Sequence, residues 1–184
     1  RDINASRAEA RKLLAAAGVP NLSFTFTNRN VAMPYTPVGV FLIDQWRQIG
    51  VTAKHEQLET RLYLAAQQRD KPTFEAALDF NCDFMDEPNL QLQNYLSHDR
   101  STINYAQQTD RVLDDLFDKQ SGELDKKKRF AILREFEKRA LEQAYTIPTI
   151  WWHRIIVHHK PIKGWYITPS HYVGQDLSDV WLDQ

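Results

Sequence analysis

The sequence predicts an α/β fold, and three observations support this prediction. Residues 4–18 have the composition of a helix, residues 22–58 show a strand, helix and strand pattern, and helical periodicity is strong over residues 109–144. Alternating strands and helices with short connections are typical of helices packed on a largely parallel sheet. With 184 residues, of which 42% are hydrophobic, the chain is long enough to bury the core of one sizeable domain.

A first helix is predicted over NASRAEARKLLAAAG, residues 4–18. Alanine, arginine, lysine, leucine and glutamate all favour the helical conformation, and either Asn4 or Ser6 can act as the N-cap. Gly18 stands at the position where a helix commonly ends in a left-handed residue. We therefore expect the helix to end just before Gly18.

A strand, a helix and a second strand follow with short connections. The stretch LSFTFTN, residues 22–28, alternates apolar and hydroxyl side chains with the period of a strand. In PYTPVGVFLIDQWRQIG, residues 34–50, apolar side chains recur at helical spacing at Val38, Leu42, Trp46 and Ile49, and Gly50 ends the run. Because VTAKHEQL, residues 51–58, predicts the next strand, we expect a βαβ unit whose two strands are parallel.

The rest of the chain continues the alternation. A helix is predicted over residues 60–69, a strand over 74–81, helices over 109–120 and 124–144, a buried apolar strand over 146–159, and an irregular tail from Gly164. We expect two helices to bury one face each, with Val112, Leu113, Leu116 and Phe117 in the first, and Phe130, Leu133, Phe136, Ala140 and Ala144 in the second. The run 146–159 is nearly all apolar and rich in β-branched and aromatic residues, as is typical of a buried strand.

Composition argues against several functional classes. The formal net charge of −1 gives no reason to expect binding to nucleic acid or to an anionic membrane surface. No apolar run approaches 18 residues, and the single cysteine, Cys82, cannot form an internal disulfide. Because the chain opens with RDINASRAEARKLL, without an initiating methionine or an apolar leader, we expect a fragment or a processed product.

Five segments follow one another along the chain: ARKLLAAAGVP, MPYTPVGVFLIDQWRQIGVTAKHE, FNCDFMDEPN, INYAQQTDRVLDDLFDKQ and YTIPTIWWHRIIVHHKPIKGW. In this order they resemble the C-terminal half of family 5 extracytoplasmic solute-binding proteins. The resemblance extends from about Ser6 to Leu182. These proteins serve ABC importers of peptides, opines and nickel. The order of the five segments carries the resemblance, since a single Pro-Tyr-x-Pro sequence would not.

The resemblance implies a lobe of the type II periplasmic-binding-protein fold, with a mixed sheet and flanking helices. It would be half of a two-lobed clamshell that closes by a hinge. Residues 1–164 would form the C-terminal ligand-binding lobe, and residues 165–184 a tail that crosses back to an N-terminal lobe absent from this chain. The implied function is capture of a peptide or opine-like solute outside the cytoplasm, in the periplasm, and its delivery to a membrane permease.

The acidic corner FNCDFMDEPN, residues 80–89, provides the first candidate ligand contacts. In dipeptide and oligopeptide binders an aspartate at this corner receives the ammonium group of the ligand, and the resemblance assigns that position to Asp83, with Asn81, Cys82 and Phe84 around it. A carboxylate suits this task because it accepts charge-assisted hydrogen bonds. Glu87 is an extra residue relative to the family, and the alternative for Asp86 and Glu87 is solvation or capping of the next helix.

A second departure from the family concerns the ligand carboxylate. Dipeptide binders hold it with an arginine just before the Pro-Tyr-x-Pro segment, where this chain has Met33. Arg29 is the nearest arginine, and its guanidinium can supply a bidentate clamp. The alternative is a solvated charge in a loop. With Met33 in place, a longer peptide, an opine or another amino-bearing solute becomes a more credible ligand than a free dipeptide.

Aromatic and amide side chains complete the candidate set. Trp151 and Trp152 are adjacent on a predicted strand and should point to opposite faces, so that one is core and the other lines the cleft. Asn104 and Tyr105 match the Asn-Tyr segment that lies near the cleft in the family. Cys82 is expected to be a small buried residue rather than a nucleophile.

No catalytic, metal or cofactor site is predicted. His158 and His159 would point apart on a strand, as would His153 and His158, and no Cys or His spacing fits zinc. The acidic residues Asp79, Asp83, Asp86 and Glu87 lie in one short segment, whereas a glycosidase pair faces across a cleft. The alternatives left open are binding of an oligosaccharide or a metal complex by the same fold, a hydrolase, and an interaction module that docks on a permease.

Overall fold

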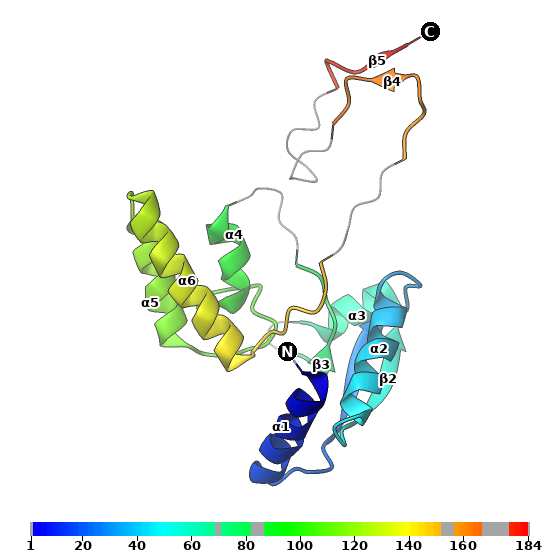
Figure 1. Ribbon diagram of the computed structural model, residues 1–184, viewed down its shortest axis with the longest axis vertical. Helices are drawn as coiled ribbons and strands as arrows, with labels where there is room; N and C mark the ends of the chain where they lie inside the picture. The colour runs from blue at the N-terminus through cyan, green and yellow to red at the C-terminus, as the bar shows by residue number, and fades with distance from the viewer. Residues whose placement is uncertain (1, 69–70, 82–86, 152–156, 167–176, 184) are drawn as a thin grey trace. The chain divides into compact units, whose positions relative to one another are not determined.

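The computed structural model describes residues 2–68, 71–81, 87–151, 157–166 and 177–183 (Figure 1). The chain divides into two compact units, residues 1–80 and residues 81–184, and each is described by itself. Cys82, Asp83, Phe84 and Trp152 lie outside the described residues.

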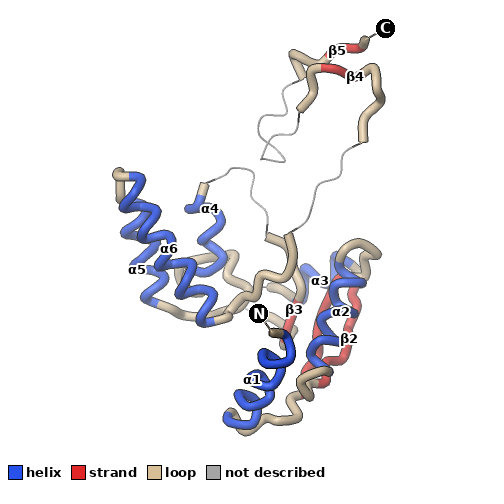
Figure 2. The backbone as a smooth tube through the Cα atoms, in the orientation of Figure 1, coloured by secondary structure: helices blue, strands red, loops and turns tan. Residues whose placement is uncertain are grey.

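Helices and strands alternate through the first unit, whereas helices dominate the described part of the second (Figure 2). The elements are α1 (Ile3–Ala16), β1 (Ser23–Arg29), α2 (Tyr35–Arg47), β2 (Thr52–Leu58), α3 (Thr60–Ala66), β3 (Ala76–Ala77), α4 (Pro88–Leu92), the 3-10 helix η1 (Gln93–Tyr95), α5 (Arg111–Gly122), α6 (Lys126–Gln143), β4 (Ile162–Lys163) and β5 (Trp181–Leu182). The α/β class predicted from the sequence is confirmed.

The first unit is built on a parallel sheet with strand order β2-β1-β3. The β1 and β2 strands pair in register from Ser23 opposite Thr52 to Arg29 opposite Leu58, so the predicted βαβ unit is confirmed. The third strand is much shorter than predicted, because only Ala76 and Ala77 pair with β1. β1 is therefore the central strand of the sheet.

Both faces of β1 are covered by helices. Phe24 and Phe26 make edge-to-face contacts with Trp46 of α2, with ring centroids 5.2 and 5.1 Å apart. Thr27 and Arg29 point the other way by strand alternation, and the Arg29 guanidinium lies over the ring of Tyr63 in α3. A central strand covered on both faces explains why Phe26, Thr27 and Asn28 are all buried.

Two helix ends follow the predictions, and one start differs. Gly18 and Gly50 adopt positive φ angles of 76° and 90°, as expected for residues that follow a helix. The prediction that Asn4 or Ser6 caps α1 is wrong, because the carboxylate of Asp2 accepts the Asn4 N–H at 2.8 Å. A carboxylate two residues ahead of Asn4 lets the helix begin at Ile3.

The described helices of the second unit share a small core. Leu96, Leu113, Leu116, Phe136 and Ala140 are buried together where α5 packs against α6.

Three residues predicted to be buried there are exposed. Val112 is 51% exposed, since it lies about 100° around α5 from Leu113. Phe130 is 63% exposed, since six residues before Phe136 corresponds to a rotation of about 120° around α6. Ala144 is exposed because it is the C-cap of α6 and has left the helical conformation, with a φ angle of 52°.

The prediction of a buried strand over 146–159 is wrong for the described residues 146–151 and 157–159, which are neither strand nor buried. Trp151 is 94% and Val157 91% exposed. Apolar composition favours a strand, but a strand forms only where a neighbouring backbone pairs with it.

The tail is not wholly irregular as predicted. β5 pairs antiparallel with β4, with Ile162 opposite Leu182 and Lys163 opposite Trp181. Gly164 permits this return, because a Cβ there would lie 1.9 Å from the Asp179 carbonyl oxygen.

No helix in the described residues is long and apolar enough to cross a membrane.

Replacing Gly39 with alanine should destabilise the protein by roughly 1–3 kcal/mol, because the added Cβ overpacks the contact between α2 and the sheet. That Cβ would lie 2.5 Å from Asn28 Nδ2 and 2.7 Å from His55 Nε2. Gly122→Ala in α5 is the matched control, since a Cβ there meets nothing within 4 Å. Urea unfolding of both variants measures the effect, and equal stabilities would contradict the close packing at Gly39.

Candidate functional site

The predicted site residues fall into both units. Arg29 and Met33 belong to the first unit, and Asn81, Asn104, Tyr105 and Trp151 to the second. The contacts of Arg29 that the structure describes all lie within the first unit.

Arg29 ends β1 inside an aromatic cluster. Its guanidinium carbon lies 5.0, 5.2 and 5.3 Å from the ring centroids of Tyr35, Tyr63 and Phe80. Its Nη1 donates to the Tyr35 hydroxyl at 3.3 Å, and its side chain is only 14% exposed. Three ring faces stabilise a cation that is largely removed from water. The alternative of a solvated loop charge is wrong for Arg29.

Among the described residues, Asp79 is the carboxylate paired with this guanidinium, and it is held by other groups. Asp79 Oδ1 lies 3.9 Å from Arg29 Nη2. The same oxygen accepts the Phe80 N–H at 2.8 Å, and Oδ2 accepts from Gln67 Nε2 at 2.9 Å. Gln67 is itself buried and also donates to the Tyr63 hydroxyl at 2.9 Å. Charge and aromatic rings are thus fixed together by α3 and the segment after β3.

Asn28, which precedes Arg29, ties this cluster to the βαβ unit. Its Nδ2 donates to the Tyr35 carbonyl at 2.7 Å, and its Oδ1 accepts the Arg29 N–H at 2.8 Å. These two contacts fix which end of the amide is which, because the carbonyl needs a donor and the N–H needs an acceptor. The second hydrogen of Nδ2 is then directed at His55 Nε2, which lies 3.2 Å away.

His55 must be neutral for that contact to exist. Its Nε2 accepts from Asn28 only when Nδ1 carries the ring proton. The ring also stacks on Phe26, with centroids 5.9 Å apart. Burial lowers the pKa of His55 below its ordinary value of 6.5.

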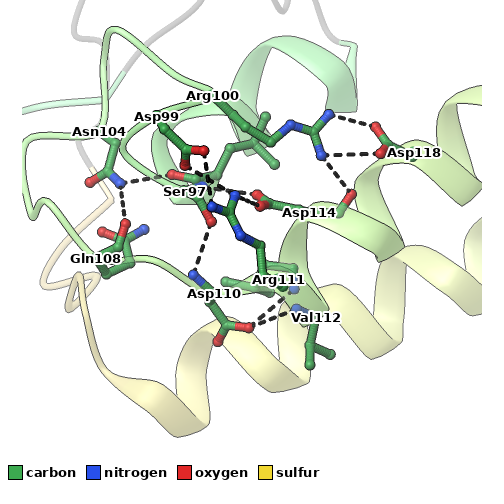
Figure 3. Close-up of polar contacts among 12 residues, drawn as sticks. Ser97, Asp99, Arg100, Asn104, Gln108, Asp110, Arg111, Val112, Asp114 and Asp118 are labelled. Carbon is green, nitrogen blue, oxygen red and sulfur yellow. Dashed lines mark hydrogen bonds and ion pairs between the residues drawn. The ribbon is translucent and has the colours of Figure 1, made fainter.

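Asn104 is buried in the second unit and supports a loop (Figure 3). Its Nδ2 donates to the carbonyls of Leu96 and Gln108 at 2.7 and 3.0 Å. Its Oδ1 is buried and has no hydrogen-bond partner among the described residues. In this chain the donors of Asn104 serve the loop, and its predicted place at the cleft stays a prediction.

Buried carboxylates anchor the same loop to α5 (Figure 3). Asp114 accepts the Ser97 N–H at 2.9 Å, and Asp110 accepts the N–H groups of Val112 and Leu113 at the start of the helix. Burial alone raises the pKa of Asp110, but hydrogen bonds from Arg139 and from these backbone groups lower it below the ordinary value.

The pKa of Asp114 is also lowered. Hydrogen bonds from Ser97 and Arg111 outweigh its burial. Two partly exposed ion pairs, Arg100 with Asp118 and Arg111 with Asp99, flank the network. These charges have structural partners, which argues against a catalytic role for them.

Glu87, the extra residue of the acidic corner, caps a helix. Its carboxylate accepts the Asn89 N–H at the start of α4 and pairs with Arg129 of α6. The hydrogen bond from Arg129 lowers the pKa of Glu87. The capping alternative is thus confirmed for Glu87, while Asp86 lies outside the described residues.

The remaining described candidates are exposed. Met33 is 68%, Tyr105 40% and Trp151 94% exposed. Asn81 is exposed as well, and its side-chain oxygen accepts from Asn94 at 3.2 Å. Exposed aromatic and thioether side chains are available to a ligand or to another protein surface.

Within the described part of the chain, no group of three or more His, Cys, Asp or Glu side chains could hold a metal ion. The structure describes His158 and His159 but not His153.

Comparison with known proteins gives matches at the level of structure. No protein-family model and no curated protein matches the sequence. An ABC transporter-associated periplasmic binding protein, DppA from Helicobacter pylori in complex with the peptide STSA, superposes with a TM-score of 0.79 over 96% of this chain, at 21% identity. HbpA2 from Haemophilus parasuis superposes with a TM-score of 0.75 over 96% of this chain, at 20% identity. AgaA in complex with agropinic acid, from A. tumefaciens R10, superposes with a TM-score of 0.66 over 75% of this chain, at 22% identity.

This chain has the fold of one part of a periplasmic ABC-transporter binding protein. It spans 34%, 35% and 28% of the lengths of these three structures, about a third of each. The resemblance seen in the sequence is therefore confirmed as a likeness in fold to a portion of such proteins.

Several residues of this binding-protein fold were not predicted from the sequence. Tyr35, Tyr63 and Asp79 surround Arg29, and Asn28 and His55 lie beneath α2. The position of Asn28 and Arg29 at the end of a predicted strand could have indicated a site, since polar residues at the carboxyl ends of parallel strands gather at one edge of the sheet. Tyr63 and Asp79 gave none, because their approach to Arg29 depends on the packing of α3 and on the pairing of β3 with β1.

Acidification should lower the free energy of unfolding through His55. The folded state holds His55 with a pKa below 6.5, so the unfolded state binds more protons and stability rises with pH. The contribution is fully present above about pH 6.5 and is lost as pH falls toward the lower folded pKa. In His55→Gln the Gln carbonyl can accept from Asn28, and the slope of stability between pH 7.5 and 5.5 should flatten. An unchanged slope in urea unfolding would contradict the neutral, accepting His55.

Removal of the Asn104 amide should destabilise the second unit. Asn104→Ala loses two buried hydrogen bonds, and we expect a loss of about 1–3 kcal/mol. Thr102→Ala, at an exposed position of the same loop, should change stability by less than about 0.5 kcal/mol. Equal thermal denaturation of the two variants would show that Asn104 does not hold the loop.

Proposed function

We propose that this chain is the ligand-binding lobe of a solute receptor for an ABC importer. It captures a peptide or a related amino-bearing solute and hands it to the membrane permease. The observation that supports this is the superposition of nearly the whole chain on part of a peptide-bound periplasmic binding protein. The five ordered sequence segments, found without that superposition, support the same function.

Capture takes place between this lobe and an N-terminal lobe, with residues 165–184 crossing back to it. Two rigid lobes that close on a solute remove water from its charged groups and strengthen their contacts. The closed form is the one that the permease recognises, and closure shifts a population that already exists. This proposal places the protein in the periplasm and requires no cofactor, metal or chemical turnover.

In this proposal Asp83 is the main ligand contact. Its carboxylate receives the ammonium group of the solute, with Asn81, Cys82 and Phe84 beside it. Arg29 pairs with an anionic group of the solute. This role suits a guanidinium whose only described carboxylate neighbour is 3.9 Å away.

The apolar part of the solute meets aromatic walls. One tryptophan of the Trp151–Trp152 pair supplies one wall, and Asn104 and Tyr105 border the same cleft. Met33, in place of an arginine, favours a longer peptide or an opine over a free dipeptide. The high exposure of Trp151 in this chain supports a contact made with a ligand or with the other lobe.

Asp83→Asn should weaken solute binding by more than tenfold, because a neutral amide cannot provide a charge-assisted contact to an ammonium group. Stability should change by less than about 1 kcal/mol, as for a substitution outside the core. Calorimetry with the tetrapeptide Ser-Thr-Ser-Ala measures the affinity, and Asp86→Asn in the same corner is the control. Equal affinities of the two variants would remove Asp83 from the proposal.

A further inference from the structure

Arg29 and Asp79 form an ion pair in which the two charged groups do not hydrogen-bond to each other. Their nearest charged atoms, Nη2 and Oδ1, are 3.9 Å apart, beyond hydrogen-bond distance. The Arg29 side chain is largely removed from water, with 14% of its surface exposed, whereas the Asp79 side chain is 25% exposed and partly reaches solvent. A largely buried cation normally hydrogen-bonds to a nearby opposite charge, because it has lost its hydration. The gap therefore needs a structural cause.

The guanidinium is held in place by rings. Tyr35, Tyr63 and Phe80 surround it at 5.0–5.3 Å, and its one described hydrogen bond goes to the neutral Tyr35 hydroxyl at 3.3 Å. Its Nε is buried and has no hydrogen-bond partner among the described residues. The hydrogen bonding of Arg29 is thus mostly unused, although its position is fixed.

The carboxylate is held from the opposite side. Gln67 donates to Oδ2 at 2.9 Å, and the Phe80 N–H donates to Oδ1 at 2.8 Å. Each carboxylate oxygen can accept two hydrogen bonds, so Asp79 has acceptor capacity left. Because both partners are anchored by other groups, they present a positive and a negative charge side by side.

We propose that Arg29 and Asp79 together bind a zwitterionic headgroup, in which an ammonium and a carboxylate are carried on one carbon. The carboxylate accepts from the Arg29 Nη hydrogens, and the ammonium donates to Asp79. This rests on the proposed function and narrows it to amino-bearing solutes whose ammonium and carboxylate share one carbon, with Asp79 taking the ammonium contact that the proposed function gives to Asp83.

Electrostatics favours a zwitterion over a simple ion. The pair is neutral as a whole, so a lone anion on Arg29 is repelled by Asp79, and a lone cation on Asp79 is repelled by Arg29. A headgroup with both charges places each one beside its opposite and away from its like. Phe80, whose side chain is exposed, gives the carbon skeleton of the solute an apolar surface next to the guanidinium.

The test uses the purified protein and three probes with one carbon skeleton. L-Leucine carries both charges, leucinamide lacks the carboxylate, and 4-methylpentanoate lacks the ammonium group. Titration is followed by nuclear magnetic resonance shifts of the Arg29 side chain and the Phe80 amide. We expect leucine to bind at least tenfold more tightly than either analogue. Equal affinities for the three probes would overturn the proposal without any substitution in the protein.

Asp79→Asn then separates the two charges. It should weaken the binding of leucine at least tenfold and leave the binding of 4-methylpentanoate unchanged or tighter. The second probe has no ammonium group that Asp79 could hold, and its carboxylate no longer meets a like charge. Asp115→Asn, an exposed aspartate of the second unit, is the control. Weakening of leucine and 4-methylpentanoate by the same factor would show that Asp79 acts only on the fold, and would overturn the proposal.

The tetrapeptide Ser-Thr-Ser-Ala distinguishes failure here from failure of the proposed function. If it binds and depends on Asp83, while the leucine series shows no discrimination, then the receptor proposal holds and the headgroup site is wrong. If leucine shows the expected discrimination and the tetrapeptide does not bind, the headgroup site holds and peptide capture is wrong.

Discussion

The buried amide of Asn28 is the constraint on which the first unit depends. From the centre of the sheet it donates to the Tyr35 carbonyl at the start of α2 and to His55 of β2, and it accepts the Arg29 N–H. Gly39 provides the space for it, since any Cβ there would collide with Asn28 and His55. One side chain thus sets where α2 begins and where Arg29 emerges from β1. A buried amide with all of these contacts satisfied fixes one arrangement, because every alternative leaves a polar group without a partner.

The second unit is organised by helix starts rather than by a sheet. Glu87, Asp110 and Asp125 each cap a helix, and Asp110 also receives the Arg139 guanidinium at 2.9 Å. Such caps need only local sequence, so each helix is well defined even where few apolar side chains are buried. This explains how a small core centred on Phe136 supports both α5 and α6.

Charge is used differently in the two units. Two ion pairs of the second unit, Arg100 with Asp118 at 2.7 Å and Arg111 with Asp99 at 2.9 Å, are short and hold a loop against α5. The pair of Arg29 and Asp79 in the first unit is long, and each partner is anchored by other groups. The short pairs use their hydrogen-bonding groups to hold the fold together. Arg29 and Asp79 are fixed in place but do not hydrogen-bond to each other, so donors of Arg29 stay unused among the described residues. In the function proposed above, this unused hydrogen-bonding capacity would hold the charged groups of the solute.

The sequence by itself determined the elements whose causes are local. The βαβ unit followed from periodicity over residues 22–58, and the helix ends followed from Gly18 and Gly50, because spacing and backbone freedom act within a few residues. The order of five segments also predicted the fold later found by superposition. Only the tertiary structure decided which apolar residues are buried, as Phe130 and Trp151 show, since burial depends on what lies opposite. It also decided that Asp79 and Tyr63 meet Arg29, because the pairing of β3 with β1 and the packing of α3 bring together residues that are far apart in the sequence.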